Sequence, residues 1–257
     1  MRLALRMQGL EKLLRGVLKY RAEVQPTMVQ QFKELSDPKA LVFSCMDSRV
    51  LLTRVLQSEV GDMFLVRNAG NLVPHSKLVD HNAITTDAGA LELACVVCNV
   101  KNVIVCGHSD CKAMHLLYSI RDQLQGYNDS PLQTWMRRHG GASVTKLEQL
   151  EVHGNEAPLK FTPGPIEPFT ALIDPENQFN IQDKLSMVNT LQQVTNIASY
   201  PFMQDKLKSG DVRVHAMWFD VYTGNFYLFN KTDQQFTIVT ESNYDKLMVE
   251  ALGAGKK

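Results

Sequence analysis

Two apolar segments that each end in metal-binding side chains constrain this chain more than any other feature. The first reads LVFSCMDSR over residues 41–49 and carries Cys45, Asp47 and Arg49 at alternate positions. The second reads NVIVCGHSDC over residues 102–111 and ends in a His-x-x-Cys pair. Apolar runs of this kind are typical of buried parallel strands, which build sites at their carboxyl ends. The sequence therefore predicts one site shared by two strand ends.

The side chains at these ends are suited to zinc. Cys45, His108 and Cys111 are ligands of the kinds that Zn²⁺ prefers, and three protein ligands leave a fourth tetrahedral position open, as in catalytic zinc sites. Asp47 is a candidate base beside that position, and Arg49 can hold its carboxylate off the metal by a bidentate pair. The alternatives are a core cysteine at a strand end and an ordinary surface ion pair.

The other cysteines are expected to be structural. Cys95 and Cys98 have the spacing of a ligand pair, but they lie in residues 85–99, an apolar segment that predicts a buried helix. We therefore expect two core thiols there, and a third at Cys106 in the second strand segment. The sequence shows no secretory leader, so the five cysteines are expected to be thiols of a reducing compartment.

Helix and strand patterns alternate along the chain, which is typical of a mostly parallel β-sheet flanked by helices, an α/β fold. Further strands are expected at residues 63–68, 212–221 and 226–229, and helices at residues 50–56, 112–125, 131–151, 181–198 and 203–208. A Gly-containing turn joins the last two strands, so an antiparallel edge strand is expected near the C-terminus. Residues 153–180 hold half of the ten prolines and are interpreted as an extended surface segment.

An apolar stripe follows one face of a helix near the N-terminus: Leu10, Leu13, Leu14, Val17 and Leu18. It predicts an N-terminal helical arm, residues 1–25, that packs on the core or on a second subunit, and residues 26–257 are assigned to a single domain. A helix on a membrane surface and a targeting peptide remain as alternatives, and Glu11 and Glu23 count against both. The targeting-peptide alternative implies a mitochondrial localisation, which is the expectation, with the cytoplasm as the alternative.

Charge and hydropathy argue against two classes of partner. The 27 basic residues equal the 27 acidic ones, so no global basic field favours nucleic acid. No apolar run approaches the roughly 20 residues of a membrane span. We expect no nucleic-acid partner and no membrane span.

Three motifs carry a resemblance to a known family: Cys-x-Asp-x-Arg at residues 45–49, VRNAGNLVP at 66–74 and Gly-His-Ser-x-Cys at 107–111. Together they resemble the β-class carbonic anhydrases over roughly residues 26–230. The joint pattern is highly specific. The resemblance implies reversible hydration of CO₂ to bicarbonate and a proton by a zinc-bound hydroxide. It also implies a homodimer or higher homo-oligomer in which the N-terminal arm embraces a second subunit.

The resemblance assigns roles to individual residues. It implies Zn²⁺ on Cys45, His108 and Cys111. It also implies a gate in which Arg49 restrains Asp47, and Asp47 becomes the fourth ligand in a closed state. No residue is assigned as the proton shuttle.

The resemblance also locates a substrate pocket and departures from the family at several positions. Phe64 is expected at the apolar wall that receives CO₂, while Leu93 stands where plant-type members carry a tyrosine. Val42 and Ser44 stand where bicarbonate-inhibited members carry tryptophan and glycine. We interpret the chain as an animal- or invertebrate-like member without the bicarbonate allosteric pocket.

Two other functions remain open at this point. The same fold can hydrolyse CS₂ or COS with the same ligand motif, and access to the pocket would decide between the substrates. A non-catalytic zinc or redox protein is the third possibility. Asp47 and Arg49 argue against it, because a structural site needs no acid and base beside an open position.

Overall fold

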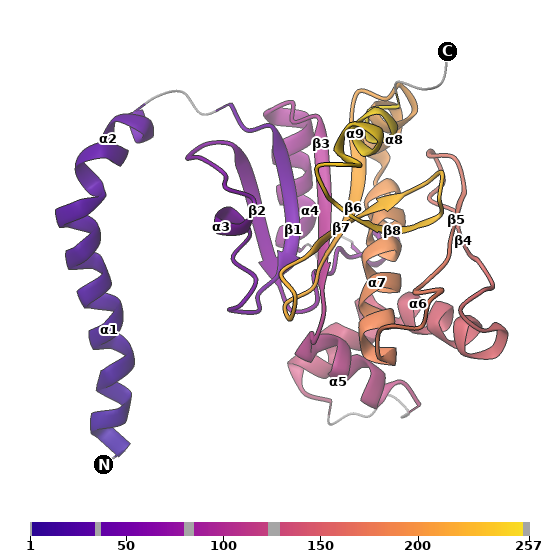
Figure 1. Ribbon diagram of the computed structural model, residues 1–257, viewed down its shortest axis with the longest axis horizontal. Helices are drawn as coiled ribbons and strands as arrows, with labels where there is room; N and C mark the ends of the chain where they lie inside the picture. Colours follow the sequence, from indigo (N-terminus) through magenta and orange to yellow (C-terminus); the bar gives the residue numbers. More distant parts are fainter. Residues whose placement is uncertain (1, 34–36, 80–84, 123–128, 254–257) are drawn as a thin grey trace.

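The structure is a computed structural model that describes residues 2–33, 37–79, 85–122 and 129–253. Its centre is a six-stranded sheet in the order β2-β1-β3-β6-β7-β8 (Figure 1). The strands are β1 (Ala40–Cys45), β2 (Met63–Asn68), β3 (Asn102–His108), β6 (Arg213–Phe219), β7 (Phe226–Asn230) and β8 (Gln235–Ile238). The first four in this list are mutually parallel, whereas β7 and β8 run antiparallel at one edge. The expected fold class is confirmed, with β8 as an edge strand that the sequence had not indicated.

Helices pack against the sheet and against one another. Helix α7 (Ile181–Ala198) packs on β3 and β6, and α5 (Lys112–Ile120) and α6 (Pro131–His153) pack on α7. The remaining elements are α3 (Leu52–Val55), η1 (Ser76–Leu78), α4 (Thr86–Glu92), η2 (Leu93–Val97), β4 (Leu159–Phe161), β5 (Phe169–Ala171), α8 (Pro201–Lys208) and α9 (Tyr244–Ala251). The expected extended segment holds the small β4–β5 hairpin, and α9 had not been predicted.

The core lies on both faces of the sheet because strand side chains alternate between them. Along β1, Leu41, Phe43 and Cys45 belong to the large cluster under the helices. Val42 belongs to a smaller cluster that includes Cys106 on the opposite face. The alternation turns Cys45 toward the helices, and the prediction that Cys106 is a core thiol is confirmed.

The prediction of one long buried helix over residues 85–99 is wrong. Helix α4 ends at Glu92 and continues as the π-helical turn η2. Only one face of this segment, which includes Cys95, packs on the core; Val97 on the other side is 70% exposed, and Cys98 is exposed too. An all-apolar pattern does not reveal which faces the rest of the chain covers.

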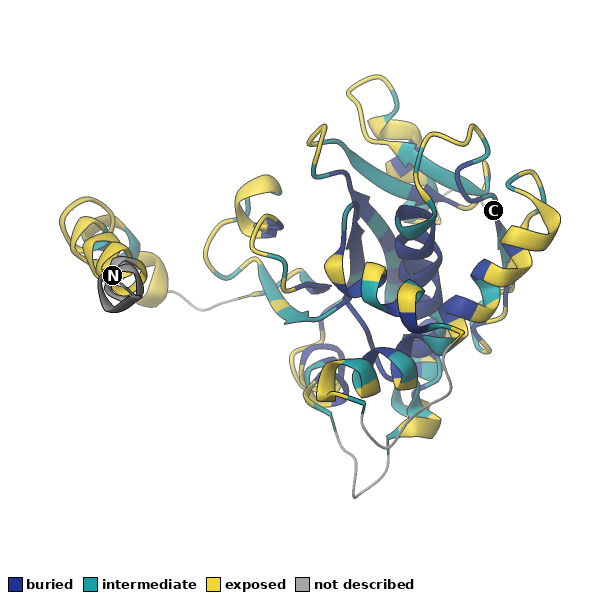
Figure 2. Ribbon diagram, turned by 90° about the horizontal axis from the view of Figure 1, so that it is seen from below, coloured by how far each residue is buried: buried dark blue, intermediate teal, exposed yellow. Residues whose placement is uncertain are grey.

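The N-terminal helices stand apart from the sheet (Figures 1 and 2). Helix α1 (Arg2–Glu23) is followed by α2 (Gln25–Lys33), and the two are linked by the hydrogen bond from Thr27 N–H to the Val24 carbonyl. The apolar stripe of α1 is exposed along its length. The division between arm and domain at residues 25 and 26 remains a prediction. Among the described residues, no helix is long and apolar enough to cross a membrane.

Candidate metal centre

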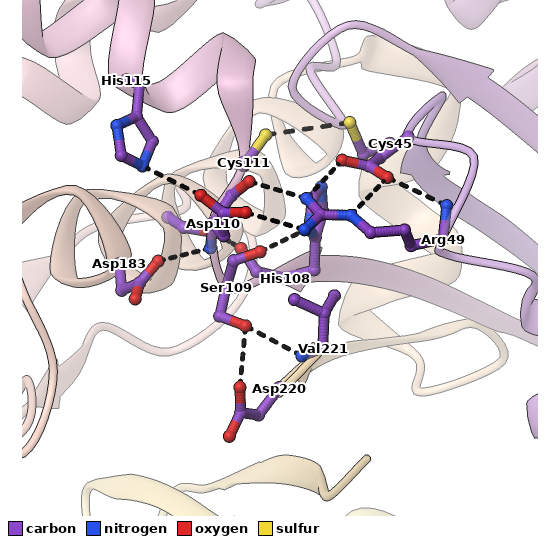
Figure 3. Close-up of polar contacts among 12 residues, drawn as sticks. Cys45, Arg49, His108, Ser109, Asp110, Cys111, His115, Asp183, Asp220 and Val221 are labelled. Atoms are coloured by element: carbon purple, nitrogen blue, oxygen red, sulfur yellow. Dashed lines mark hydrogen bonds and ion pairs between the residues drawn. The ribbon is translucent and has the colours of Figure 1, made fainter. Parts of the chain in front are cut away.

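Three ligand atoms meet where β1 and β3 end (Figure 3). Because these strands are parallel neighbours, their carboxyl ends lie side by side. Cys45 is the last residue of β1, His108 the last of β3, and Cys111 caps the N-terminus of α5. The two Sγ atoms are 3.8 Å apart, and all three ligand atoms lie within 4.8 Å of one another. All three residues are buried.

The histidine presents a free nitrogen to this cluster. Its Nδ1 lies 2.8 Å from the carbonyl oxygen of Ser109, which fits an Nδ1–H donor and leaves Nε2 with a lone pair. Nε2 of His108 is buried and has no hydrogen-bond partner within the described part of the chain. A buried acceptor without a partner is costly unless something binds it. Together with two thiols, this donor set fits a tetrahedral zinc ion.

The surroundings favour thiolate at the cluster. A hydrogen bond from the Cys111 thiol lowers the pKa of Cys45, and His108 and the Gly70 N–H lower it further. The same hydrogen bond raises the pKa of Cys111, because a second thiolate beside the first is unfavourable without a cation. The N–H groups of Ala113 and the following residue oppose that rise at the start of α5. The pair therefore holds one negative charge readily and a second when a metal cation is present.

Asp47 and Arg49 lie beside the cluster and form the bidentate pair that the spacing predicts. Arg49 Nε donates to Oδ1 of Asp47 at 3.0 Å, and Nη2 donates to Oδ2 at 2.8 Å. The main-chain N–H of Arg49 adds a third bond, to Oδ1 at 2.9 Å. Hydrogen bonds from Arg49 hold the pKa of Asp47 well below its usual range. Asp47 is thus ionised at any ordinary pH and is held by its own segment.

Arg67 fixes the segment that carries Cys45 and Asp47, and sequence reasoning missed it. It projects from β2, and its Nε and Nη2 donate to the main-chain carbonyls of Cys45 and Asp47 at 3.0 and 2.6 Å. These two bonds bracket the turn that follows β1. Its place at the end of a strand, inside the VRNAGNLVP motif, was the available signal.

A row of buried amides on α7 supports the loop that faces Cys45. Gly70, in a left-handed conformation with φ of +83°, accepts a hydrogen bond from Asn189 at its carbonyl. Gln193 accepts from the N–H of Val73, and its own amide donates to Asn189. A Cβ on Gly70 would come within 2.8 Å of the Met114 side chain, so loop and α5 approach closely there. Nothing in the local pattern of α7 identified these amides as partners of the loop.

Phe64 and Leu93, the expected substrate-pocket residues, are not among the residues that line the groove reaching Met46, the neighbour of Cys45 in the chain. That groove is lined in part by Met46, Asn68 and Trp135. Phe64 lies in the first half of β2, half-buried against the main core, and Leu93 begins η2 and is 49% exposed. Neither lines the groove, and their assignment to a pocket remains a prediction.

Comparison with known proteins agrees with this geometry. A family model described as carbonic anhydrase matches residues 40–226. Beta carbonic anhydrase 1 of Caenorhabditis elegans is 40% identical over 250 residues, covering 94% of this chain and 92% of that protein. The Caenorhabditis briggsae protein of the same name is 39% identical over the same length. The solved structure of the β-carbonic anhydrase CcaA superimposes with a TM-score of 0.71 at 25% identity, covering 91% of this chain and 93% of that one.

A parallel sheet with a Cys-His-Cys cluster at its carboxyl edge defines a class of metalloenzyme, and the family match specifies it. The chain belongs to the β-class carbonic anhydrases. The resemblance inferred from the three motifs is confirmed.

Proposed function

We propose that this chain hydrates CO₂ reversibly at a zinc ion held by Cys45, His108 and Cys111. The observation that carries the proposal is the meeting of three buried ligand atoms, one of them the unpartnered Nε2 of His108. A zinc ion bound there would supply an acidified water as the nucleophile. Two thiolates bound to that ion would neutralise much of its charge, so we expect the chain's own residues to assist with the proton.

Asp47 and Arg49 are proposed to control the fourth position. As long as Arg49 holds both oxygens of Asp47, this carboxylate stays away from the metal and can accept a hydrogen bond from water. If the pair parted, Asp47 would be free to take the fourth position on a bound ion and so close the site. Arg67 keeps the Asp47 main chain in place during this exchange, because it holds the carbonyl and not the carboxylate.

The arm is proposed to be a contact of a homodimer or higher homo-oligomer. Its stripe of exposed leucines and the exposed face of η2 both present apolar surface that a single chain leaves in water. A second copy of the chain is the partner that this arrangement favours.

Stopped-flow CO₂ hydration on protein with a measured zinc content tests the catalytic proposal. Cys45→Ser is the matched control, since it removes one ligand and keeps size and shape. Zinc-dependent hydration in the parent and its loss in the control are expected. Hydrolysis of COS or CS₂ without CO₂ hydration would replace this function with that of a hydrolase on the same fold. Zinc binding without either activity would favour a non-catalytic protein.

A further inference from the structure

We propose that Asp110 is a positioning residue that anchors Arg49 and so biases the Asp47 gate toward its open state. The inference rests on the proposed role of Asp47 and Arg49 at the metal. Asp110 is neither a metal ligand nor a member of the Asp47–Arg49 pair. Its side chain sets how firmly Arg49 holds Asp47.

The guanidinium of Arg49 is held along two edges (Figure 3). One edge, Nε and Nη2, faces the carboxylate of Asp47. On the other edge, Nη1 donates to Oδ2 of Asp110 at 2.7 Å and Nη2 donates to the main-chain carbonyl of Asp110 at 2.9 Å. A planar fork held on both edges has one orientation, and that orientation directs Nε and Nη2 at Asp47.

Asp110 is itself fixed by the fold. Its backbone has φ of +50°, a left-handed conformation that aspartate tolerates better than most residues. Its N–H donates to Oδ1 of Asp183 at 2.7 Å. Asp183 is buried in the first turn of α7, where Asn180 caps the helix and bonds to its carboxylate. A chain of contacts thus runs from α7 through Asp110 to Arg49 and ends at Asp47.

The anchor matters because the Arg49–Asp47 pair alone is partly exposed. The Arg49 side chain is 41% exposed and that of Asp47 12%. An isolated pair of this kind gains little, since ordering a long side chain offsets the attraction. The hydrogen bonds to Asp110 already order the Arg49 side chain. Pairing with Asp47 therefore costs little additional conformational entropy. Without the Asp110 side chain, Arg49 is freer to turn away, and Asp47 is released toward the metal.

Two substitutions separate anchoring from charge. Asp110→Asn and Asp110→Gly both remove the negative charge, and both residues tolerate a positive φ. Only asparagine keeps an oxygen that can accept from Nη1 of Arg49. If Asp110 acts as an anchor, the two variants differ. If only its charge matters, they behave alike.

The measurement is access of azide to the metal in Co²⁺-substituted full-length protein, followed by the visible absorption spectrum. We expect azide to bind Asp110→Asn within about twofold of the parent, and Asp110→Gly about tenfold more weakly, as for the loss of one charge-assisted hydrogen bond. Adding Asp47→Ala to Asp110→Gly should restore azide binding to the level of Asp47→Ala alone.

Equal azide affinities in the Asn and Gly variants would overturn the proposal. So would a defect in Asp110→Gly that persists without Asp47, or loss of cobalt from Asp110→Gly, since each assigns the side chain to support of the ligands. The readout is anion binding and not turnover. Parent protein that binds cobalt and azide but does not hydrate CO₂ would therefore count against the proposed function alone.

Discussion

Arg49 binds the carboxylate of Asp47 through two parallel hydrogen bonds from one edge of its guanidinium. Nε donates to Oδ1 at 3.0 Å and Nη2 donates to Oδ2 at 2.8 Å. This geometry means that the two residues should act as a unit. A carboxylate released from arginine next to a zinc site is itself an acceptable ligand. The functional consequence of losing Arg49 therefore depends on whether Asp47 is present.

A mutant cycle on this pair tests that dependence. Arg49→Ala should keep its zinc and lose most CO₂ hydration, because freed Asp47 blocks the fourth position. Asp47→Ala removes the base along with the blocking ligand, so its loss should be smaller, on the order of 10²–10⁴-fold. In the double variant the Arg49 effect should largely vanish. The measurement is kcat/KM for all four proteins at one pH, and losses that simply multiply would refute the gate.

Zinc stoichiometry tests the ligand set. The parent should bind one ion per chain, and Cys45→Ser, His108→Ala or Cys111→Ser should each lose it. Cys95→Ser and Cys98→Ser are the controls and should retain it. They differ in burial, so together they separate a general effect of thiol loss from a ligand effect. Full zinc content after Cys45→Ser would rule out the assignment.

The ligand set was predictable because its signals are local. A parallel strand places its last side chains at the sheet's carboxyl edge, so Cys45 and His108 could be placed together from apolar runs alone. Cys111 follows from the short spacing after His108 and from the helix that begins there. The Asp47–Arg49 pair also lies within one short turn.

Arg67, Asp110 and the amides of α7 act through tertiary contacts, and no local pattern specifies the partners in those contacts. Arg67 reaches across from β2 to two carbonyls of the turn after β1. Gln193 meets Val73 across a separation of 120 residues. The prediction that residues 85–99 form a buried helix was wrong for a related reason. An apolar helix pattern does not show which face of the helix the rest of the chain covers.

Removal of residues 1–24 tests the arm. If the stripe of α1 docks on a second copy, its deletion should expose the docking surface and weaken a homodimer. Light scattering over a dilution series gives the mass, and a variant with Leu13→Gln and Leu14→Gln keeps the arm while disrupting its apolar face. An unchanged dimer mass in both proteins down to low concentration would remove the claim.

Bicarbonate should not close this enzyme cooperatively. Val42 and Ser44 stand where the resemblance places the residues of the bicarbonate switch, and both are fully buried, with Ser44 Oγ near the Cys45 carbonyl at 3.4 Å. Activity near pH 7 should therefore fall on adding bicarbonate only as product inhibition requires. Initial rates across a bicarbonate series provide the check, and a sigmoidal loss of activity would contradict the expectation.

The last prediction concerns acid stability and His139. This imidazole is buried on α6 against the ring of Trp135, with centroids 4.5 Å apart, and its Nδ1 has no hydrogen-bond partner among the described residues. Burial lowers its pKa to about 4 from the ordinary value of 6.5. Between pH 4 and pH 6.5, His139 is therefore protonated in the unfolded chain and neutral in the native chain. Stability is therefore unaffected by this group above pH 6.5 and falls as the pH drops toward 4.

Replacement of His139 by phenylalanine should remove that loss, because the new ring packs on Trp135 and cannot take up a proton. At 1.36 kcal/mol per pKa unit, the parent should lose about 2 kcal/mol more than the variant between pH 7 and pH 4.5. Urea unfolding at the two pH values measures it, with His153→Phe as the control, since His153 is exposed on the same helix. The parent and His139→Phe differ only at this residue. If both lose the same free energy of unfolding across this pH range, the buried imidazole does not contribute to the loss of stability in acid.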